Sequence, residues 1–338
     1  MHGLVYEDFL YGDKMKLTLK LASLIALIAL ALIEPLALAQ AWPVKPIRII
    51  NPFPAGGGTD TFARPLSAKL TQSLGQSVII ENQGGAGGTV GAANAARTIP
   101  DGYTFLMGAI HHTIAESLYP KLSYNIEKDF IPVTMVAQVP QVMVVHPKHP
   151  FRNIKELVDY AKANPGKLNF GSPGAGTSHH LAMELFMKVT GTNFVHVPYR
   201  GAGPMMQDFL AGQIDLVFDG MGTSSTQIKA GKLRGLAIAT SARAPSFPDL
   251  PTMEESGVNG MVINTWYALW AVKDTPKAIV DRMQQESAKV MNLPDMKEIW
   301  ASQLAETGGN TPDQFRAFVR SEVVRWSKVV KDANVILN

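Results

Sequence analysis

Residues 46–74 read PIRIINPFPAGGGTDTFARPLSAKLTQSL, and this stretch decides the fold. Its first six residues are rich in isoleucine and predict a short strand that ends at Asn51. Three consecutive glycines follow at 56–58, and Thr59 or Asp60 can cap a helix that starts there. Apolar residues then recur on one helix face, at Phe62, Leu66, Leu70 and Leu74. A strand, a glycine-rich turn and a helix in this order are the unit of an α/β fold.

The alternation of strands and helices continues along the chain. Further strands are predicted at 78–82, 103–107, 142–146, 168–170, 194–197, 215–218, 233–239 and 267–272. Helices are predicted between them, including 153–164, 176–190 and the final segment 311–331. This pattern predicts an α/β protein with mainly parallel sheets. We expect two lobes, residues 42–144 plus 266–338 and residues 145–265, with the chain crossing between them twice.

Length and composition exclude several classes of protein. A chain of 338 residues has room for about two domains, and 46% hydrophobic residues exclude a disordered chain. The net charge of +3 is too small to indicate nucleic-acid binding. The absence of cysteine excludes cysteine-based zinc sites, iron–sulfur ligation, disulfides and cysteine nucleophiles.

The N-terminal residues 1–39 are typical of a signal peptide. Lysines precede a run of 13 apolar residues, LASLIALIALALI at 21–33, which is short for a membrane-spanning helix. Ala37-Leu38-Ala39 then offers a cleavage site, with a second option after Ala41, and Met15 is a possible true start. We therefore expect an exported, soluble mature protein in the periplasm, the alternative being an uncleaved membrane anchor.

Two glycine-rich loops are the strongest candidates for a ligand site. The first is 51–60, NPFPAGGGTD, and the second is 171–180, GSPGAGTSHH; each follows a predicted strand and precedes a predicted helix. Ligands of open α/β sheets bind at this edge, and the free amides of a helix start attract anions. One such loop in each lobe is suited to clamping a carboxylate. The alternative for both loops is a tight connection with helix capping alone.

Other motifs do not indicate a cofactor, a metal or an enzyme. Residues 84–91, GGAGGTVG, fail the dinucleotide fingerprint and instead predict close packing of a helix on the sheet. The pairs His111-His112 and His179-His180 are poor chelates, although His112 or His179 is a candidate ligand donor. Ser178 lies in a near match to the nucleophile elbow of hydrolases, which lacks the final glycine.

These motifs together resemble the extracytoplasmic solute receptors of the tripartite tricarboxylate transporter system, the Bug receptor family. The matching blocks include WPVKPIRIINPFPAGGGTDTFARPL, VIIENQGGAGGTVGAANAAR, LNFGSPGAGTSHHLAMELF and HVPYRGAGPMMQDFLAGQIDLVFDG, and they span about residues 42–330. The resemblance implies the two-lobed type II periplasmic binding protein fold, with two crossover strands between lobes.

The resemblance also implies a site that closes around a carboxylate through amides, hydroxyls and water. From the first lobe it implies Phe53, Pro54, Ala55, Gly56, Gly57, Thr59, Asp60, Ala109 and His112. From the second lobe it implies Ser172, Gly174, Gly176, Thr177, Ser178, Arg200, Gly201 and Asp219. The chain departs from the family at Ile110-His111-His112, where Ser or Thr before a single His is common.

The function implied is a receptor that binds a small organic carboxylate, as a monomer, and delivers it to integral membrane subunits of such a transporter. It requires no cofactor and no nucleic acid. Two alternatives stay open: an exported α/β hydrolase, and a receptor that feeds a sensor rather than a transporter. No nucleophile, base and acid occur at a recognisable spacing, which disfavours the hydrolase.

Overall fold

The computed structural model describes residues 42–119 and 121–333. The predicted signal peptide lies outside the described residues. Within the described part, no helix has both the length and the apolar character needed to cross a membrane. The described residues from Lys45 onward form one compact unit.

The first lobe is built on three parallel strands in the order β2-β1-β3. These are β2 (Val78–Asn82), β1 (Ile47–Asn51) and β3 (Thr104–Ala109). β9 (Asn264–Val272) pairs antiparallel to β3, and β4 (Phe130–Val145) pairs antiparallel to β9. A two-residue strand, β10 (Glu306–Thr307), pairs with β4. The predicted strand, turn and helix at 46–74 are therefore confirmed, but the sheet contains antiparallel as well as parallel pairs.

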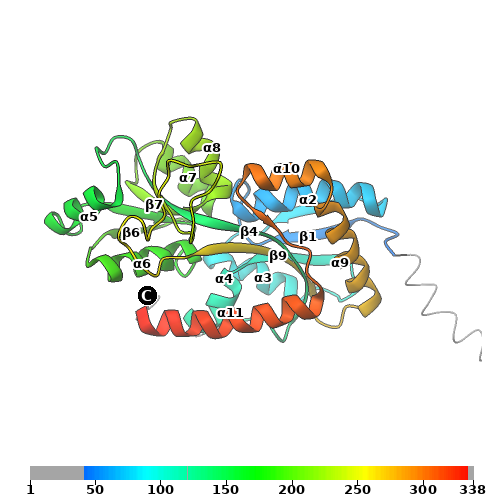
Figure 1. Cartoon of the computed structure of the whole chain (residues 1–338). Helices are drawn as coiled ribbons and strands as arrows, with labels where there is room; N and C mark the ends of the chain where they lie inside the picture. Colours follow the sequence, from blue (N-terminus) through cyan, green and yellow to red (C-terminus); the bar gives the residue numbers. More distant parts are fainter. Residues whose placement is uncertain (1–41, 120, 334–338) are drawn as a thin grey trace, which may run out of the picture. The chain divides into compact units, whose positions relative to one another are not determined.

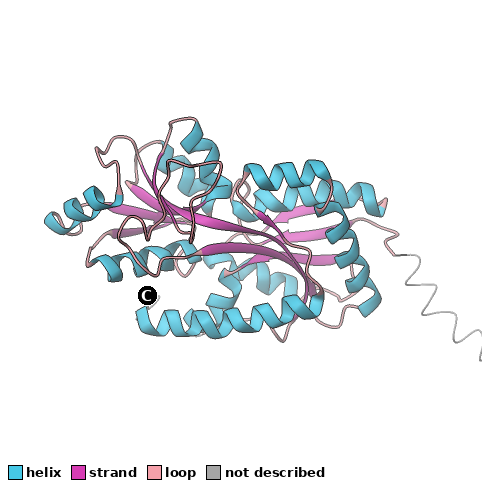
Figure 2. Cartoon of the chain, viewed as in Figure 1, coloured by secondary structure: helices cyan, strands magenta, loops and turns pink. Residues whose placement is uncertain are grey.

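The second lobe continues the same ten-stranded sheet (Figures 1 and 2). β5 (Asn169–Ser172) lies between β6 (Val195–Pro198) and β7 (Leu216–Gly220), all parallel. The last part of β4 pairs antiparallel with β7 and with β8 (Arg234–Ile238). Its parallel strands carry helices on their faces, so this lobe is a second α/β unit.

Two strands carry the chain between the lobes. β4 pairs with β9 as far as Pro140 and with β7 from Gln141 onward. The return crossing lies beside it, because the Gln141 amide donates to the carbonyl of Ile263 at 3.1 Å. The two-lobed fold with two crossover strands is thus confirmed, while the lobe boundaries at 144/145 and 265/266 stay a prediction.

Helices cover both faces of the sheet (Figure 2). The first lobe carries α2 (Gly58–Leu74), the short 3₁₀ helix η1 (Ala86–Gly88), α3 (Thr89–Ala96), α4 (His111–Leu118), α9 (Lys277–Met291), α10 (Pro294–Ser302) and α11 (Pro312–Ala333). The second lobe carries α5 (Ile154–Ala163), α6 (Ser178–Thr190), α7 (Ala202–Leu210) and α8 (Met221–Lys229). The predicted helices at 153–164, 176–190 and 311–331 are confirmed within a few residues.

The sequence prediction found only the last part of β4. Pro132 and Pro140 interrupt the strand pattern, and proline usually argues against an internal strand. The structure accommodates the first proline at an irregularity, where the register between β4 and β9 shifts between Pro132 and Thr134. The crossover strand is therefore longer than its apolar core at 142–146 indicates.

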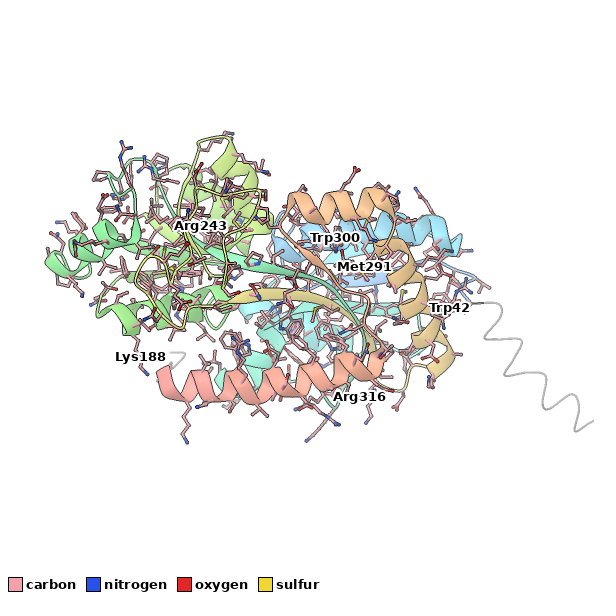
Figure 3. The ribbon with its side chains drawn as sticks, viewed as in Figure 1. Trp42, Lys188, Arg243, Met291, Trp300 and Arg316 are labelled. Carbon is pink, nitrogen blue, oxygen red and sulfur yellow. The ribbon has the colours of Figure 1, made fainter. Side chains whose placement is uncertain are left out.

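A buried tryptophan of α10 packs against α2, the helix whose first turn reaches the site. Trp300 of α10 is 1% exposed, and its indole nitrogen donates to the Val136 carbonyl of β4 at 3.0 Å (Figure 3). The edge of its ring meets Phe62 of α2, with centroids 5.2 Å apart. Burial of two large aromatic rings holds the first turn of α2 at a defined place on the sheet.

Candidate ligand-binding site

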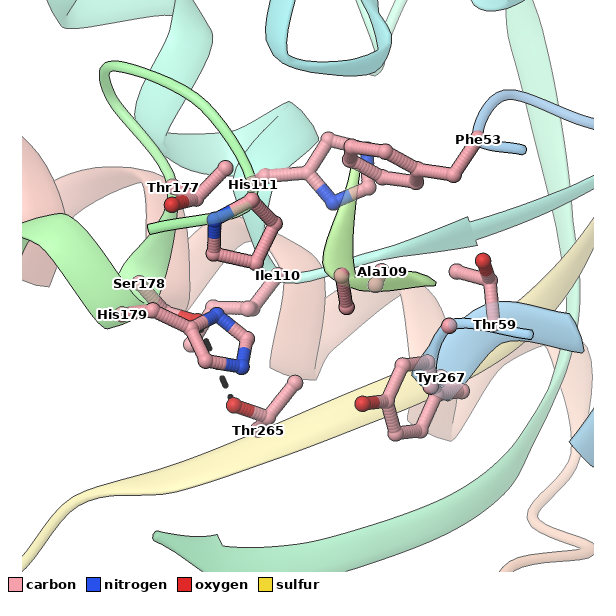
Figure 4. A pocket seen from close by; sticks show the side chains of 14 residues that line it. Phe53, Thr59, Ala109, Ile110, His111, Thr177, Ser178, His179, Thr265 and Tyr267 are labelled. Carbon is pink, nitrogen blue, oxygen red and sulfur yellow. Dashed lines mark hydrogen bonds between the residues drawn. The ribbon is translucent and has the colours of Figure 1, made fainter. Parts of the chain in front are cut away.

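A cavity lies between the two lobes, at the carboxyl ends of β1, β3 and β5 (Figure 4). We call it the ligand cavity; counted with the solvent at its mouth, it encloses about 380 Å³. First-lobe residues and β9 residues on its wall are Phe53, Gly57, Gly58, Thr59, Ala109, Ile110, His111, Thr265 and Tyr267. Second-lobe residues are Pro173, Thr177, Ser178, His179 and Ala202. Parallel strand ends are where α/β folds bind ligands.

The start of α2 presents backbone donors to the ligand cavity. Gly57 precedes the helix, and the amides of Gly57, Gly58 and Thr59 make no hydrogen bond within the described chain. Gly58 is required here, because a Cβ at this position would lie 2.0 Å from the Tyr267 hydroxyl oxygen. The Thr59 hydroxyl is also buried without a partner. This turn therefore holds several unsatisfied polar groups at the cavity wall.

The start of α6 supplies the matching wall from the second lobe. The Thr177 hydroxyl caps the helix, accepting from the His180 amide at 3.4 Å and donating to the Gly174 carbonyl at 2.8 Å. The amides of Ser178 and His179 have no partner among the described residues. The hydroxyl proton of Thr177 is thus used inside the loop, while the backbone donors next to it are available.

Two more helices begin at the same cavity. α4 starts at His111, directly after β3, and α7 starts at Ala202, after the loop that contains Arg200 and Gly201. Each helix N-terminus carries a partial positive charge of about half an elementary charge. Four helix starts, two from each lobe, therefore point their positive ends at one small volume.

The side chains on the cavity wall add no negative charge. The wall contains no Asp or Glu. His111 is 5% exposed, and burial, together with the nearby His112 and His179, lowers its pKa well below 6.5. His111 is therefore neutral at pH 7, its Nε2 is buried without a partner, and its ring packs edge-on against Phe53 with centroids 4.7 Å apart. An anion in the ligand cavity would therefore meet no negatively charged side chain on its wall.

Two buried carboxylates stand behind the wall and hold it in place. Burial alone raises the pKa of Asp219, but the nearby His179 ring and hydrogen bonds from Ser224 and Thr223 to Oδ2 outweigh this and lower it overall. His179 Nε2 lies 3.5 Å from Asp219 Oδ1, which orients the ring beside the cavity.

Asp60 plays the same part for the first loop. Its carboxylate accepts from the Gly56 amide at 3.1 Å and from Arg64 Nε at 2.7 Å. Burial raises its pKa, and the bonds from Arg64, Gly56 and Asn82 lower it below the ordinary value. Asp60 therefore shapes the glycine loop from within and does not line the cavity.

The structure brings together six of the predicted site residues: Phe53, Gly57, Thr59, Ala109, Thr177 and Ser178 line the ligand cavity. Pro54, Ala55, Gly56 and Gly201 lie at the contact between lobes, where a Cβ at Gly201 would come 2.7 Å from Pro54 Cδ. Ser172 and Gly176 support the second loop, since Ser172 Oγ lies 2.7 Å from His196 Nε2 and the Gly176 amide donates to His180 Nδ1.

The structure places His111, and not the predicted His112, on the cavity wall. The ring that lines the cavity is His111, whereas His112 is fully buried behind it with Nδ1 2.6 Å from the Tyr124 hydroxyl oxygen. Burial lowers the pKa of His112 to about 3. Adjacent residues at a helix start point in different directions, so the sequence pair did not show which ring faces the ligand.

Sequence reasoning missed several residues that the fold brings to the cavity. Thr265 and Tyr267 lie on β9, far along the chain from either glycine loop. They are two residues apart, so both side chains lie on the same face of the strand. Thr265 Oγ1 lies 3.2 Å from Ser178 Oγ (Figure 4) and 2.8 Å from Gln141 Nε2, which donates to it. The period-two spacing of the two β9 residues was the one available signal.

The same residues test the hydrolase alternative. Ser178 Oγ lies 3.5 Å from His179 Nδ1, and His179 Nε2 lies 3.5 Å from Asp219 Oδ1. Both distances exceed the 2.6–3.2 Å typical of a nucleophile and its base. Ser178 Oγ also accepts from Gln141 Nε2 at 3.2 Å. Ser178 Oγ is thus hydrogen-bonded within the polar wall of the cavity, to Gln141 and Thr265.

The fold and the site define a class of protein: a two-lobed solute-binding protein with an anion-attracting cavity between its lobes. Residues 62–335 match the family described as tripartite tricarboxylate transporter family receptor, and the chain belongs to this family.

Relatives of this family are similar to this chain along nearly its whole length. The Bordetella pertussis protein BugT is 37% identical over 325 residues, covering 96% of this chain and 100% of BugT. The R. palustris protein Rpa4515, solved with adipate, is 33% identical with a TM-score of 0.85, covering 87% of this chain and 99% of its own. MatC from Rhodopseudomonas palustris, solved with bound malate, is 31% identical with a TM-score of 0.82, covering 86% and 100%.

Proposed function

We propose that this protein is a periplasmic receptor, acting as a monomer, that captures a small organic carboxylate between its lobes. It then delivers the carboxylate to the membrane subunits of a tripartite tricarboxylate-type transporter. The observation that carries the proposal is the convergence of four helix N-termini on a cavity whose wall has no carboxylate.

The physical case is that a carboxylate can accept hydrogen bonds from backbone amides that have no partner within the described chain. The amides of Gly58 and Thr59 on one side, and of Ser178 and His179 on the other, have no partner in the described chain. Hydrogen bonds to a charged group contribute about 1.5–3 kcal/mol each. Each helix start adds about 0.3–1 kcal/mol in favour of a negative charge. Several such terms together are enough for tight binding.

The family supports the same class of ligand. The two R. palustris relatives were solved with adipate and with malate, both of which are dicarboxylates. The predicted signal peptide and the receptor family support a periplasmic location. Delivery to a membrane transporter rests on the family alone, and a receptor that feeds a sensor is its alternative.

A thermal-shift screen tests the proposal. A ligand that binds only the folded state at a hundred times its Kd stabilises that state by about 2.7 kcal/mol. Mono- and dicarboxylates, their neutral amides and nucleotides are compared on the mature protein. We expect the melting temperature to rise with a subset of carboxylates and to stay unchanged with the matching amides. A rise with nucleotides and none with any acid would refute the carboxylate receptor.

A further inference from the structure

The buried carboxylate of Glu322 binds two tryptophan side chains at once. Glu322 lies on α11 and is 4% exposed. Its Oε2 accepts from Trp266 Nε1 of β9 at 2.8 Å and from Trp326 Nε1 of α11 at 3.1 Å. Its Oε1 accepts from the exposed guanidinium of Arg325 at 3.2 Å. A charge this deep is costly unless it is paired and hydrogen-bonded, and here its bonds tie α11 to β9.

Trp266 stands between the two β9 residues on the wall of the ligand cavity. Side chains alternate along a strand, so Thr265 and Tyr267 face the cavity while Trp266 faces α11. The Trp266 carbonyl also accepts from the amide of Ile110 at 3.2 Å, and Ile110 lines the same cavity. The places of three wall residues therefore depend on where the backbone at Trp266 lies.

The Trp266 ring also lies in a buried cluster that reaches the second lobe. α11 runs along the sheet from the first lobe to α6, against which it packs (Figure 1). Leu181, in the first turn of α6, is 2% exposed and belongs to the same cluster as Trp266 and Trp326. The start of that helix borders the ligand cavity. The bonds of Glu322 therefore lie on the far side of β9 from the cavity, close to where the lobes meet.

We propose that Glu322 is a positioning residue for ligand binding, which acts on the cavity wall through Trp266 and β9. The inference rests on the proposed function, because it requires that the ligand cavity binds a carboxylate. Glu322 does not line the cavity, so it has no contact with a ligand there. Loss of its bonds to the indoles therefore weakens binding in a protein that is still folded.

Calorimetric titration separates a positioning role from a purely structural one. The probes are adipate, malate and the acid with the largest shift in the thermal screen. Glu322→Leu removes the acceptor of both indoles, and Kd should rise about tenfold, within the range for residues that share a network.

The matched control is Glu286→Leu on α9. Glu286 is also a buried first-lobe carboxylate, 8% exposed, and it binds Ser73 and Arg282 rather than a residue of the cavity wall. Both substitutions should lower the midpoint of urea unfolding, because each leaves buried donors without an acceptor. Glu286→Leu should nevertheless keep Kd within about twofold of the wild type, since it is independent of the site.

Two further proteins show whether the effect passes through β9. Glu322→Gln keeps an oxygen that can accept from both indoles, so Kd should stay within about twofold of the wild type. Thr265→Val removes a hydroxyl from the cavity wall. Its loss of affinity should be smaller in Glu322→Leu than in the wild type, because both changes act on β9. In Glu286→Leu the loss should be the same as in the wild type.

The outcomes separate this inference from the function on which it rests. A wild-type Kd in folded Glu322→Leu, or additive effects of Glu322→Leu and Thr265→Val, would show that Glu322 only stabilises the fold and would overturn the inference. If Glu322→Leu does not fold, Trp266→Phe takes its place, since it removes the bond to β9 while Trp326 still donates to the carboxylate. A wild-type Kd in Trp266→Phe would overturn the inference as well. If the wild-type protein binds no carboxylate at all, the proposed function fails and the inference fails with it.

Discussion

The Tyr119 hydroxyl of the first lobe lies 3.1 Å from the carbonyl oxygen of Ala175 in the second lobe. Tyr119 follows the C-terminal end of α4, and Ala175 is in the loop that precedes α6, so this contact joins the end of one helix to the loop before another across the two lobes. Nearby, a Cβ at Gly174 would lie 3.3 Å from Gly87 Cα, so the two backbones also meet closely. Both contacts between the lobes lie in the loops next to the ligand cavity.

Tyr119→Phe should weaken ligand binding while leaving the fold intact. One hydrogen bond between the lobes contributes about 0.5–1.5 kcal/mol, so we expect a Kd about two- to tenfold higher, mainly through faster release. Stopped-flow dissociation kinetics measure this. Tyr160→Phe, on the exposed face of α5, is the matched control and should behave as the wild type. An unchanged release rate in Tyr119→Phe would show that the contact does not hold the lobes.

The same substitution should affect two threonines at the cavity wall differently, one mainly in ligand binding and the other mainly in stability. The Thr59 hydroxyl is buried without a partner, so Thr59→Val should cost the free protein little stability and weaken carboxylate binding about tenfold. The Thr177 hydroxyl caps α6, so Thr177→Val should lower the free energy of unfolding by about 0.5–2 kcal/mol. Denaturant melts and calorimetry on both variants provide the comparison. Equal stability losses would contradict the assignment of these roles.

Gly58 should not tolerate a side chain. Because an added Cβ would meet the Tyr267 hydroxyl, Gly58→Ala should displace the start of α2 and reduce affinity by at least tenfold. Replacing the tyrosine as well, in Gly58→Ala/Tyr267→Phe, removes the nearest atom and should restore part of the affinity. Gly220→Ala is the control, since Gly220 does not line the cavity and its Cβ would lie 3.7 Å from the nearest atom, Val139 Cγ2, an ordinary contact. A wild-type Kd in Gly58→Ala would place the ligand away from this turn.

The buried histidines should make the protein less stable in mild acid. Burial lowers the pKa of His112 to about 3, and burial with the neighbouring His180 lowers that of His196 to about 3. In the unfolded chain both titrate near 6.5. Between pH 6.5 and 3 the unfolded state therefore binds more protons, and stability falls as the pH falls, by at most about 1.4 kcal/mol per pH unit for each histidine.

Urea melts from pH 7.5 to 4.5 measure this dependence. His112→Gln should flatten the slope, because one of the groups that takes up a proton on unfolding is gone. Asp60 and Asp219 also have lowered pKa values, but they lose their stabilising effect below about pH 4, outside this range. A slope in His112→Gln equal to that of the wild type would show that this histidine titrates normally in the folded protein.

Much of the fold follows from local sequence. The strand before Gly56, the apolar face of α2 and the glycine after Leu74 lie close together in the chain, and each gives a local signal. The long crossover strand gave a weaker signal, because Pro132 and Pro140 interrupt it and only its pairing with β9 explains their place.

The two glycine-rich loops of the candidate site were predictable from the sequence, but the residues from elsewhere in the chain that complete its wall were not. Helix starts are encoded locally, so Gly57 and Ser178 could be named from the sequence. Thr265 reaches the cavity only because β9 returns between the lobes, which is a long-range property. The choice between His111 and His112 depends on how α4 leaves β3, and an adjacent pair carries no periodic signal for it.

The most direct test of the account is a crystal structure of the mature protein with the acid that binds it most tightly. We predict that the oxygens of one carboxylate lie 2.7–3.2 Å from backbone amides at the start of α2 and at the start of α6. Ligand density in the cavity with amide contacts from both lobes would establish the clamp. An acid bound outside the cavity, or held by one lobe only in a closed protein, would contradict it.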